Sequence, residues 1–325
     1  MGWLRGPTFD LGLIVGVLAL AIALGCVALV RPELLPWVLA ADLWLLAYPH
    51  VASTFTRIAF DRRSVRAHRF LLFGLPPIVF VATASATWLG GAMALNTIYF
   101  HWQAWHYTRQ SYGIARAYDR SARARASDRL TTAVIFAFPV WGLLHRAHQH
   151  PGTFYGAPLY TPPVPNVLVV ASAIFALGAL AAWTFRRLRT PTNDVGHDLF
   201  VVSHVAITVI SYILVTDVTR GWLFINIWHN AQYLVFVWAQ NAKRFRGGID
   251  PGRRFLSRIS QRENVGAYVV VCVGLGVVFY FALGQATSHL AWQVIPLFLV
   301  CHQTVNFHHY LVDAVIWRRR VRAPA

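Results

Sequence analysis

The last apolar stretch of the chain is rich in side chains that can bind metals or transfer protons. It reads VCHQTVNFHHYLVDAVIWRRR, from Val300 to Arg320, and holds three histidines, an asparagine and an aspartate. At about 100° per residue around a helix, four of them form one polar stripe: His302, Asn306, His309 and Asp313. His308 lies outside this stripe, about 100° around the helix from His309. Polar groups inside a membrane are costly and usually serve a function, so the stripe predicts a functional site.

Histidines also recur inside other apolar stretches, at similar distances from the basic residues that mark one membrane face. At about 1.5 Å of rise per residue, they lie roughly 12–22 Å from that face. The group consists of His50, His101, His106, His204, His229, His302 and His309. One buried histidine is usually a packing residue, but a whole group at one depth indicates a shared function.

Imidazole is the commonest metal ligand and suits iron, zinc and copper. Carboxylates inside the apolar stretches are few, so a site would hold several histidines and about one carboxylate. This donor set disfavours magnesium and calcium and a carboxylate-rich di-iron site. We expect non-haem iron, as one or two ions. Zinc and haem, the latter with an axial histidine from each of two helices, are the alternatives.

Helices in a membrane must position these residues. The chain has 325 residues, of which 57% are hydrophobic and 13% charged, as is typical of membrane proteins. Runs long enough to span a bilayer occur at residues 11–30, 35–60, 70–90, 92–116, 130–146, 166–186, 198–217, 221–243, 265–284 and 290–316. We therefore expect an all-α fold, a polytopic transmembrane helical bundle of about ten spans that forms one domain over residues 1–325.

The net charge of +17 raises the question of nucleic-acid binding, but the distribution of charge argues against it. Most of the 29 lysines and arginines lie in the loops after the second, fourth, sixth and eighth predicted spans and in the C-terminal tail. Loops on the other side hold only Arg31, Arg146 and Arg220. This positive-inside bias predicts cytoplasmic termini in a bacterial-type inner membrane, with membrane lipid rather than nucleic acid as the partner of the basic loops.

Four segments of the chain resemble the bacterial Brp/Blh β-carotene dioxygenases, polytopic membrane proteins that cleave carotene to retinal. The segments are YPHVAST at His50, YFHWQAWH at His101, IWHNAQYLVFVW at His229, and HHYLVDAVIWR at the C-terminal end. Histidines in these motifs bind iron in that family. The resemblance therefore implies iron ligation by His50, His101, His229 and one of His308 or His309.

Other positions depart from the pattern of that family. Tyr233 stands where a second histidine is usual, and His106 stands where an acidic residue is expected. We consider both as catalytic residues. Gln103 and Gln110 flank His106 at helical spacing and are predicted to orient its ring. His204 and His302 have no counterpart and are expected to support the ligands or to bind a second ion.

The sequence thus predicts a membrane-embedded iron oxygenase that acts on O₂ and a lipophilic substrate, such as an isoprenoid, a carotenoid or a lipid. The predicted metal-binding residues are His50, His101, His106, His204, His229, His302, His308, His309 and Asp313. An electron donor or partner subunit is left open. A proton- or metal-coupled transporter and a haem-binding electron-transfer subunit are the alternative functions.

Asp313 has two interpretations in this scheme. It lies one helical turn after His309, so it can bind the same ion or orient the ring. Alternatively, it anchors the helix end through the arginines that begin at Arg318. Positions 313 and 318 are about 140° apart around a helix, which favours the role at the site.

Overall fold

A computed structural model describes residues 2–121, 128–190, 194–289 and 296–317. These residues are almost entirely helical, and the strands among them are the two-residue pair β1 (Thr153–Phe154) and β2 (Ala157–Pro158). The predicted all-α class is confirmed. Arg318 and the first residues of the predicted span 290–316 lie outside the described residues.

Within the described residues, seven helices are long and apolar enough to cross a membrane, which indicates a membrane protein. They cover Pro7–Val30, Pro32–Phe55, Phe70–Ser121, Arg129–His148, Asn166–Arg189, Val195–Leu214 and Arg262–Ser288. Helices α10 (Val218–Arg244) and α13 (Leu297–Ile316) occupy two further predicted spans. They are not among the seven, because histidine, asparagine and glutamine lower their hydropathy. The number of spans stays a prediction.

The chain divides into two compact units. Unit 1 comprises Met1–Leu43 and Ala92–Val235, and unit 2 comprises Trp44–Gly91 and Phe236–Ala325. One boundary falls in helix α6 (Leu75–Ser121) at Gly91, whose φ of 64° and ψ of −163° interrupt the helix. Glycine adopts this conformation without steric cost, and the interruption lies between the predicted spans 70–90 and 92–116. The single domain expected over residues 1–325 stays a prediction.

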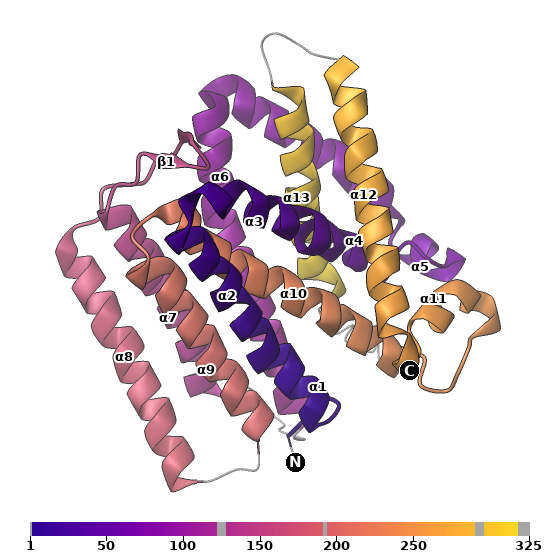
Figure 1. Ribbon diagram of the computed structural model, residues 1–325, viewed down its shortest axis with the longest axis horizontal. Coiled ribbons are helices and arrows are strands. Elements are labelled where there is room, and N and C mark those ends of the chain that lie inside the picture. Colours follow the sequence, from indigo (N-terminus) through magenta and orange to yellow (C-terminus); the bar gives the residue numbers. More distant parts are fainter. Residues whose placement is uncertain (1, 122–127, 191–193, 290–295, 318–325) are drawn as a thin grey trace. The chain divides into compact units, whose positions relative to one another are not determined.

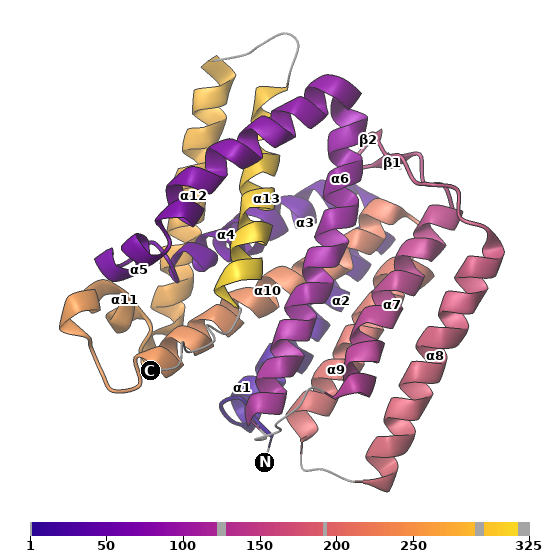
Figure 2. The same cartoon turned by 180° about the vertical axis from the view of Figure 1, so that it is seen from behind.

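Unit 1 contains helices from both ends of its sequence and a short hairpin. Its elements are α1 (Pro7–Leu11), the π-helix η1 (Gly12–Gly16), α2 (Val17–Val30), the 3₁₀-helix η2 (Pro32–Leu34), α3 (Leu35–Asp42), residues 92–121 of α6, α7 (Arg129–His148), β1, β2, α8 (Asn166–Arg189), α9 (Val195–Val209), the π-helix η5 (Ile210–Leu214) and residues 218–235 of α10. Helices α7, α8 and α9 run alongside one another (Figures 1 and 2). Val134, Phe138 and Trp183 belong to the buried cluster that joins them.

The hairpin of unit 1 is closed by a tight turn and held by a helix side chain. Tyr155 and Gly156 have φ values of 55° and 71°, as a two-residue turn of type I′ requires. The Asn96 amide of α6 donates to the carbonyl oxygens of Phe154 and Ala157, at 3.1 and 3.2 Å. These bonds anchor the loop between α7 and α8 to α6.

Unit 2 is built around the contact of α4 with α12 and α13. Its elements are most of the π-helix η3 (Leu43–Ala47), α4 (Tyr48–Phe55), α5 (Arg62–Ala67), the π-helix η4 (Phe70–Gly74), residues 75–91 of α6, residues 236–244 of α10, the 3₁₀-helix η6 (Pro251–Arg253), α11 (Arg254–Ile259), the 3₁₀-helix η7 (Arg262–Asn264), α12 (Val265–His289) and α13. Figure 2 shows α12 and α13 side by side. A Cβ on Gly276 of α12 would lie only 3.0 Å from the Tyr48 backbone, so this glycine lets α12 approach α4 closely.

Candidate functional site

A change of helical pitch precedes the first predicted ligand. The π-helix η3 ends directly before α4, which has Pro49 at its start and His50 next to it. Proline has no N–H to donate to the preceding turn, and π-turns inside helices often occur at functional sites. His50, Ser53 and Thr54 are all buried, and the Ser53 hydroxyl donates to the His50 carbonyl at 2.7 Å. The local sequence thus points the polar face of α4 into unit 2.

Helix α13 presents a second polar face within the same unit. His309 and Asp313 are one turn apart and buried, with 1% and 7% of their surfaces exposed. The distance from His309 Nε2 to Asp313 Oδ2 is 3.8 Å. The predicted proximity of these two residues is therefore confirmed, as expected for positions i and i+4 of a helix.

The two faces meet at a pair of imidazole rings. His50 Nε2 and His309 Nε2 are 2.7 Å apart, and the rings are inclined at 76° with centroids 4.6 Å apart. Unit 2 thus brings two imidazoles and one carboxylate, from His50, His309 and Asp313, into one buried cluster.

Thr54 holds this cluster in a defined protonation pattern. Its hydroxyl has one proton, which it donates to Asp313 Oδ1 at 3.2 Å. His309 Nδ1, 3.0 Å from Thr54 Oγ1, must then donate its proton to that oxygen. The lone pair of His309 consequently lies on Nε2, the atom that faces His50. A neutral imidazole with its other nitrogen donating is the usual form of a metal-binding histidine.

The spacing of the two imidazole nitrogens fits adjacent ligands of a small metal ion. Nitrogens that each lie ~2.1 Å from one ion are ~3 Å apart in adjacent positions and ~4.2 Å apart in opposite positions. The observed 2.7 Å is close to the first value. It also suits a hydrogen bond from His50 to His309, which would hold both rings in place without an ion. The donor set of two histidines and a carboxylate is the one found in non-haem iron oxygenases.

His308 lies on another side of α13. Its Nε2 is 2.6 Å from the Leu71 carbonyl, and its ring stacks on Phe55 with centroids 5.8 Å apart. Of the two adjacent histidines, the structure therefore brings His309 to His50 and uses His308 to join α13 to η4. The helical stripe predicted this outcome, whereas the resemblance left the choice between His308 and His309 open.

His302 lies among aromatic rings rather than beside His309. Its ring is 5.9 Å from that of Tyr48 and 5.5 Å from that of Tyr280. Tyr48 and Tyr280 stack on each other at 3.7 Å. His302 thus takes part in the packing of α4, α12 and α13.

Unit 1 contains its own buried pair, His106 on α6 and His229 on α10. Their ring centroids are 4.9 Å apart, at 73°, and the Tyr107 ring is 4.1 Å from that of His229. The Gln110 amide donates to the His229 carbonyl at 3.1 Å. The resemblance implied that His101 and His229 bind the same iron, and His106 was predicted as a catalytic and metal-binding residue. The structure instead places His106 next to His229.

A buried polar network surrounds this pair and was not predicted as a unit. Asp42 of α3 accepts from the side-chain amides of Asn226 and Asn230 on α10. Asn226 in turn accepts from the Tyr107 hydroxyl. The signal in the sequence was the spacing of Asn226 and Asn230, one turn apart and opposite one of the few carboxylates within a predicted span.

The remaining predicted residues of unit 1 lie elsewhere or have other partners. His101 Nδ1 is 2.9 Å from the Thr97 carbonyl one turn earlier. His204 Nε2 is 3.0 Å from the Ile135 carbonyl of α7. Tyr233 is buried one turn after His229. Gln103 accepts from the Trp222 indole at 2.7 Å, and its amide donates to Asn226 Oδ1 at 3.4 Å, so it takes part in the network around Asn226.

No protein-family model matches the chain, and no curated protein or solved structure matches it. The resemblance to the carotene dioxygenases stays a prediction based on four short segments. The two histidine pairs are the groups in the described residues that offer the predicted chemistry. Each pair lies on helices within one unit and is buried, and Thr54 bonds to the His309 ring of the pair in unit 2.

Proposed function

We propose that this chain is a membrane-embedded non-haem iron oxygenase that acts on a lipophilic substrate. The observation that carries the proposal is the cluster of His50, His309 and Asp313 in unit 2. Two imidazole nitrogens 2.7 Å apart and a carboxylate 3.8 Å from one of them offer ligands on one side of an ion. These three side chains would hold an iron ion, which would supply the chemistry with O₂.

Iron suits this donor set better than the alternatives. Structural zinc usually takes four protein ligands, often with cysteine, whereas this cluster offers two imidazoles and one carboxylate. A haem iron between His50 and His309 would need ~4 Å between their nitrogens, which exceeds the 2.7 Å observed. Bound iron would supply the activation of O₂.

The residues of the chain would have separate tasks in this reaction. His50 and His309 would offer their Nε2 lone pairs, and Asp313 would add one negative charge. Thr54 would hold the Nδ1 proton of His309 and so keep its Nε2 available. His106 and His229 would bind metal as well, so that the chain holds one or two ions, and Tyr233 would act close to His229 as a proton donor.

The membrane setting supports the substrate class. A site within apolar helices is accessible to molecules dissolved in the bilayer, and the resemblance to the Brp/Blh family favours an isoprenoid or carotenoid among them. We place ten spans in a bacterial-type inner membrane with both termini in the cytoplasm, as the distribution of basic residues predicts. An electron donor or partner subunit would be needed only if the reaction consumes external electrons.

A proton- or ion-coupled transporter is the second candidate function. The observation that favours it is Asp42, a carboxylate only 1% exposed inside the candidate span Pro32–Phe55. Ionisable residues inside membrane helices often relay protons or bind ions in transport. Asn226 and Asn230 both donate to Asp42, which also suits a structural role.

Metal analysis of the purified full-length protein, together with its optical spectrum, separates these functions. The oxygenase proposal predicts about one or two iron ions per chain and no Soret band. Protein without bound metal would favour the transporter. A Soret band would show haem and would contradict the proposal.

A further inference from the structure

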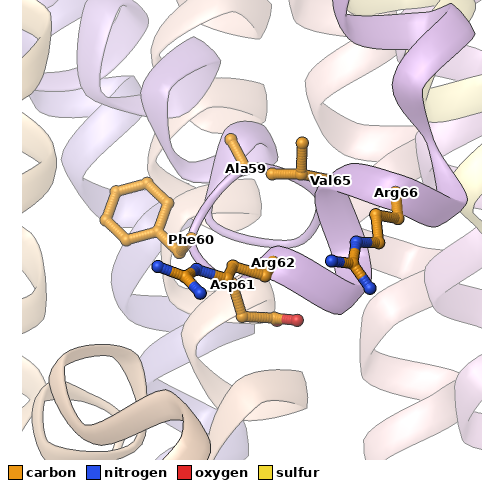
Figure 3. A pocket seen from close by; sticks show the side chains of 6 residues that line it. All are labelled: Ala59, Phe60, Asp61, Arg62, Val65 and Arg66. Carbon is orange, nitrogen blue, oxygen red and sulfur yellow. The ribbon is translucent and has the colours of Figure 1, made fainter.

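The loop between α4 and η4 contains a surface pocket that plays no part in the metal site. Its volume is about 380 Å³, and it is lined by Ala59, Phe60, Asp61, Arg62, Val65 and Arg66 (Figure 3). All six belong to unit 2. The candidate span Pro32–Phe55 ends just before the pocket and the next begins at Phe70 just after it. The pocket therefore lies where the chain leaves and re-enters the membrane.

Local hydrogen bonds fix the shape of this loop. Asp61 caps helix α5, since its carboxylate accepts from the backbone N–H and from the hydroxyl of Ser64, both at 2.8 Å. Arg62 and Arg66 follow one turn apart on α5 and therefore lie on the same helix face. In the view of Figure 3 the Asp61 carboxylate lies between the two guanidinium groups.

The negative charge of Asp61 is already compensated from the other side. Arg253 Nε lies 3.1 Å from Asp61 Oδ2, and Arg244 Nη2 lies 3.5 Å from the same atom. Burial of Asp61 favours its neutral form, but the hydrogen bonds from Ser64 and the two arginine charges outweigh it and lower the pKa of Asp61. The carboxylate thus stays ionised and is shared by two cations outside the lining of the pocket.

Arg62 and Arg66 consequently contribute positive charge that the rest of the described chain does not neutralise. Both side chains are exposed. Neither forms an ion pair with any acidic residue in the described part of the chain. Guanidinium groups bind phosphate oxygens through paired N–H donors, so two of them on one face suit a phosphate.

The other walls of the pocket are apolar. Ala59, Phe60 and Val65 contribute them, and the Phe60 ring stacks on Phe255 of α11 with centroids 5.9 Å apart. Phe255 itself is 54% exposed. A free phosphate ion would use only the arginines, whereas a phosphate joined to glycerol and acyl chains would also cover the apolar side.

We propose that this pocket binds the headgroup phosphate of an anionic phospholipid through Arg62 and Arg66, with the glycerol and first acyl carbons against Phe60 and Val65. Anionic lipids gather on the cytoplasmic leaflet and attract basic segments next to membrane spans. This site does not depend on the proposed iron chemistry, and the two can fail independently.

Titration of the detergent-solubilised full-length protein with phosphatidylglycerol, followed by native mass spectrometry, tests the proposal. Changing both arginines, as Arg62→Gln with Arg66→Gln, should lower the affinity by ~30-fold, or about 2 kcal/mol at about 1.4 kcal/mol per tenfold. The matched control removes the same charge nearby, as Arg63→Gln with Arg69→Gln, and should change it less than ~3-fold. Lysine at positions 62 and 66 should preserve most of the binding and show that the loop still folds.

Further arms of the same experiment identify the ligand. Phosphatidylcholine should bind at least ~10-fold more weakly than phosphatidylglycerol, because its headgroup carries no net charge. Phe60→Ala should weaken the binding of phosphatidylglycerol. Equal losses in the two double variants would contradict the proposal, as would equal affinity for the two lipids. Displacement of the lipid by inorganic phosphate at equal concentration would show a simple phosphate site and would also contradict it.

Discussion

Replacing Thr54 with valine tests how the site is held together. Valine has the same shape but lacks the hydroxyl that accepts from His309 Nδ1 at 3.0 Å and donates to Asp313 Oδ1 at 3.2 Å. Each buried group that loses a partner costs about 1–3 kcal/mol. Much of this cost falls equally on the protein with and without metal. What remains is the loss of ring orientation and tautomer, which typically lowers metal affinity by about 10–100-fold.

The assay is competition for Fe(II) between the purified protein and a coloured chelator of known affinity. Thr54→Val should lower the affinity for iron by about 10–100-fold, whereas Thr54→Ser keeps the hydroxyl and should stay within ~3-fold. Thr56→Val is the matched control. Thr56 is buried and bonded to Ser53 and Tyr268, so its loss should lower thermal stability and leave iron affinity unchanged. Wild-type iron affinity in Thr54→Val, or an equal loss in Thr56→Val, would refute this account of His309.

Three further predictions concern charge and topology. Asp313→Asn should fold and insert normally but lose iron or activity, and wild-type iron content with wild-type activity would mean that Asp313 only anchors the helix end. Labelling from the outer side should modify Tyr155→Cys and spare Arg258→Cys, and the reverse pattern would contradict the proposed topology. Because the pKa of Asp61 is lowered in the folded protein, its stabilising effect should be complete above about pH 4, the ordinary pKa of an aspartate, and should disappear as the pH falls through its lowered pKa. Thermal midpoints of wild type and Asp61→Asn should therefore differ at pH 7 and converge in acid, and a constant difference would refute the role of the ion pairs.

Part of the site could be predicted from sequence because helix geometry alone determines it. His309 and Asp313 are one turn apart on one helix, so their proximity follows from the period of 3.6 residues. The same period distinguished His309 from His308, since adjacent residues point about 100° apart. These predictions need no knowledge of neighbouring helices.

Other features depend on packing that no single helix reveals. His101 and His106 lie on one helix about 140° apart, and either could have faced His229. Aromatic residues occur on every side of this helix segment, so the sequence pattern does not show which face is buried. The π-helix η3 just before His50 adds a residue to one turn. The helix face on which a residue lies therefore cannot be extrapolated at about 100° per residue along the predicted span 35–60. Thr54 lies one turn after His50 and was overlooked, because a threonine in an apolar helix usually bonds only to the backbone.

The most direct test of the central claim is the iron content of two neighbouring variants on the same helix. His308 and His309 are both buried, but only His309 is bonded to His50, while His308 is bonded to the Leu71 carbonyl. We predict that His309→Ala binds iron at least ~10-fold more weakly than wild type and that His308→Ala keeps its iron, even if it is less stable. Equal iron content in the two purified variants, or iron lost from His308→Ala and retained in His309→Ala, would contradict the proposed site.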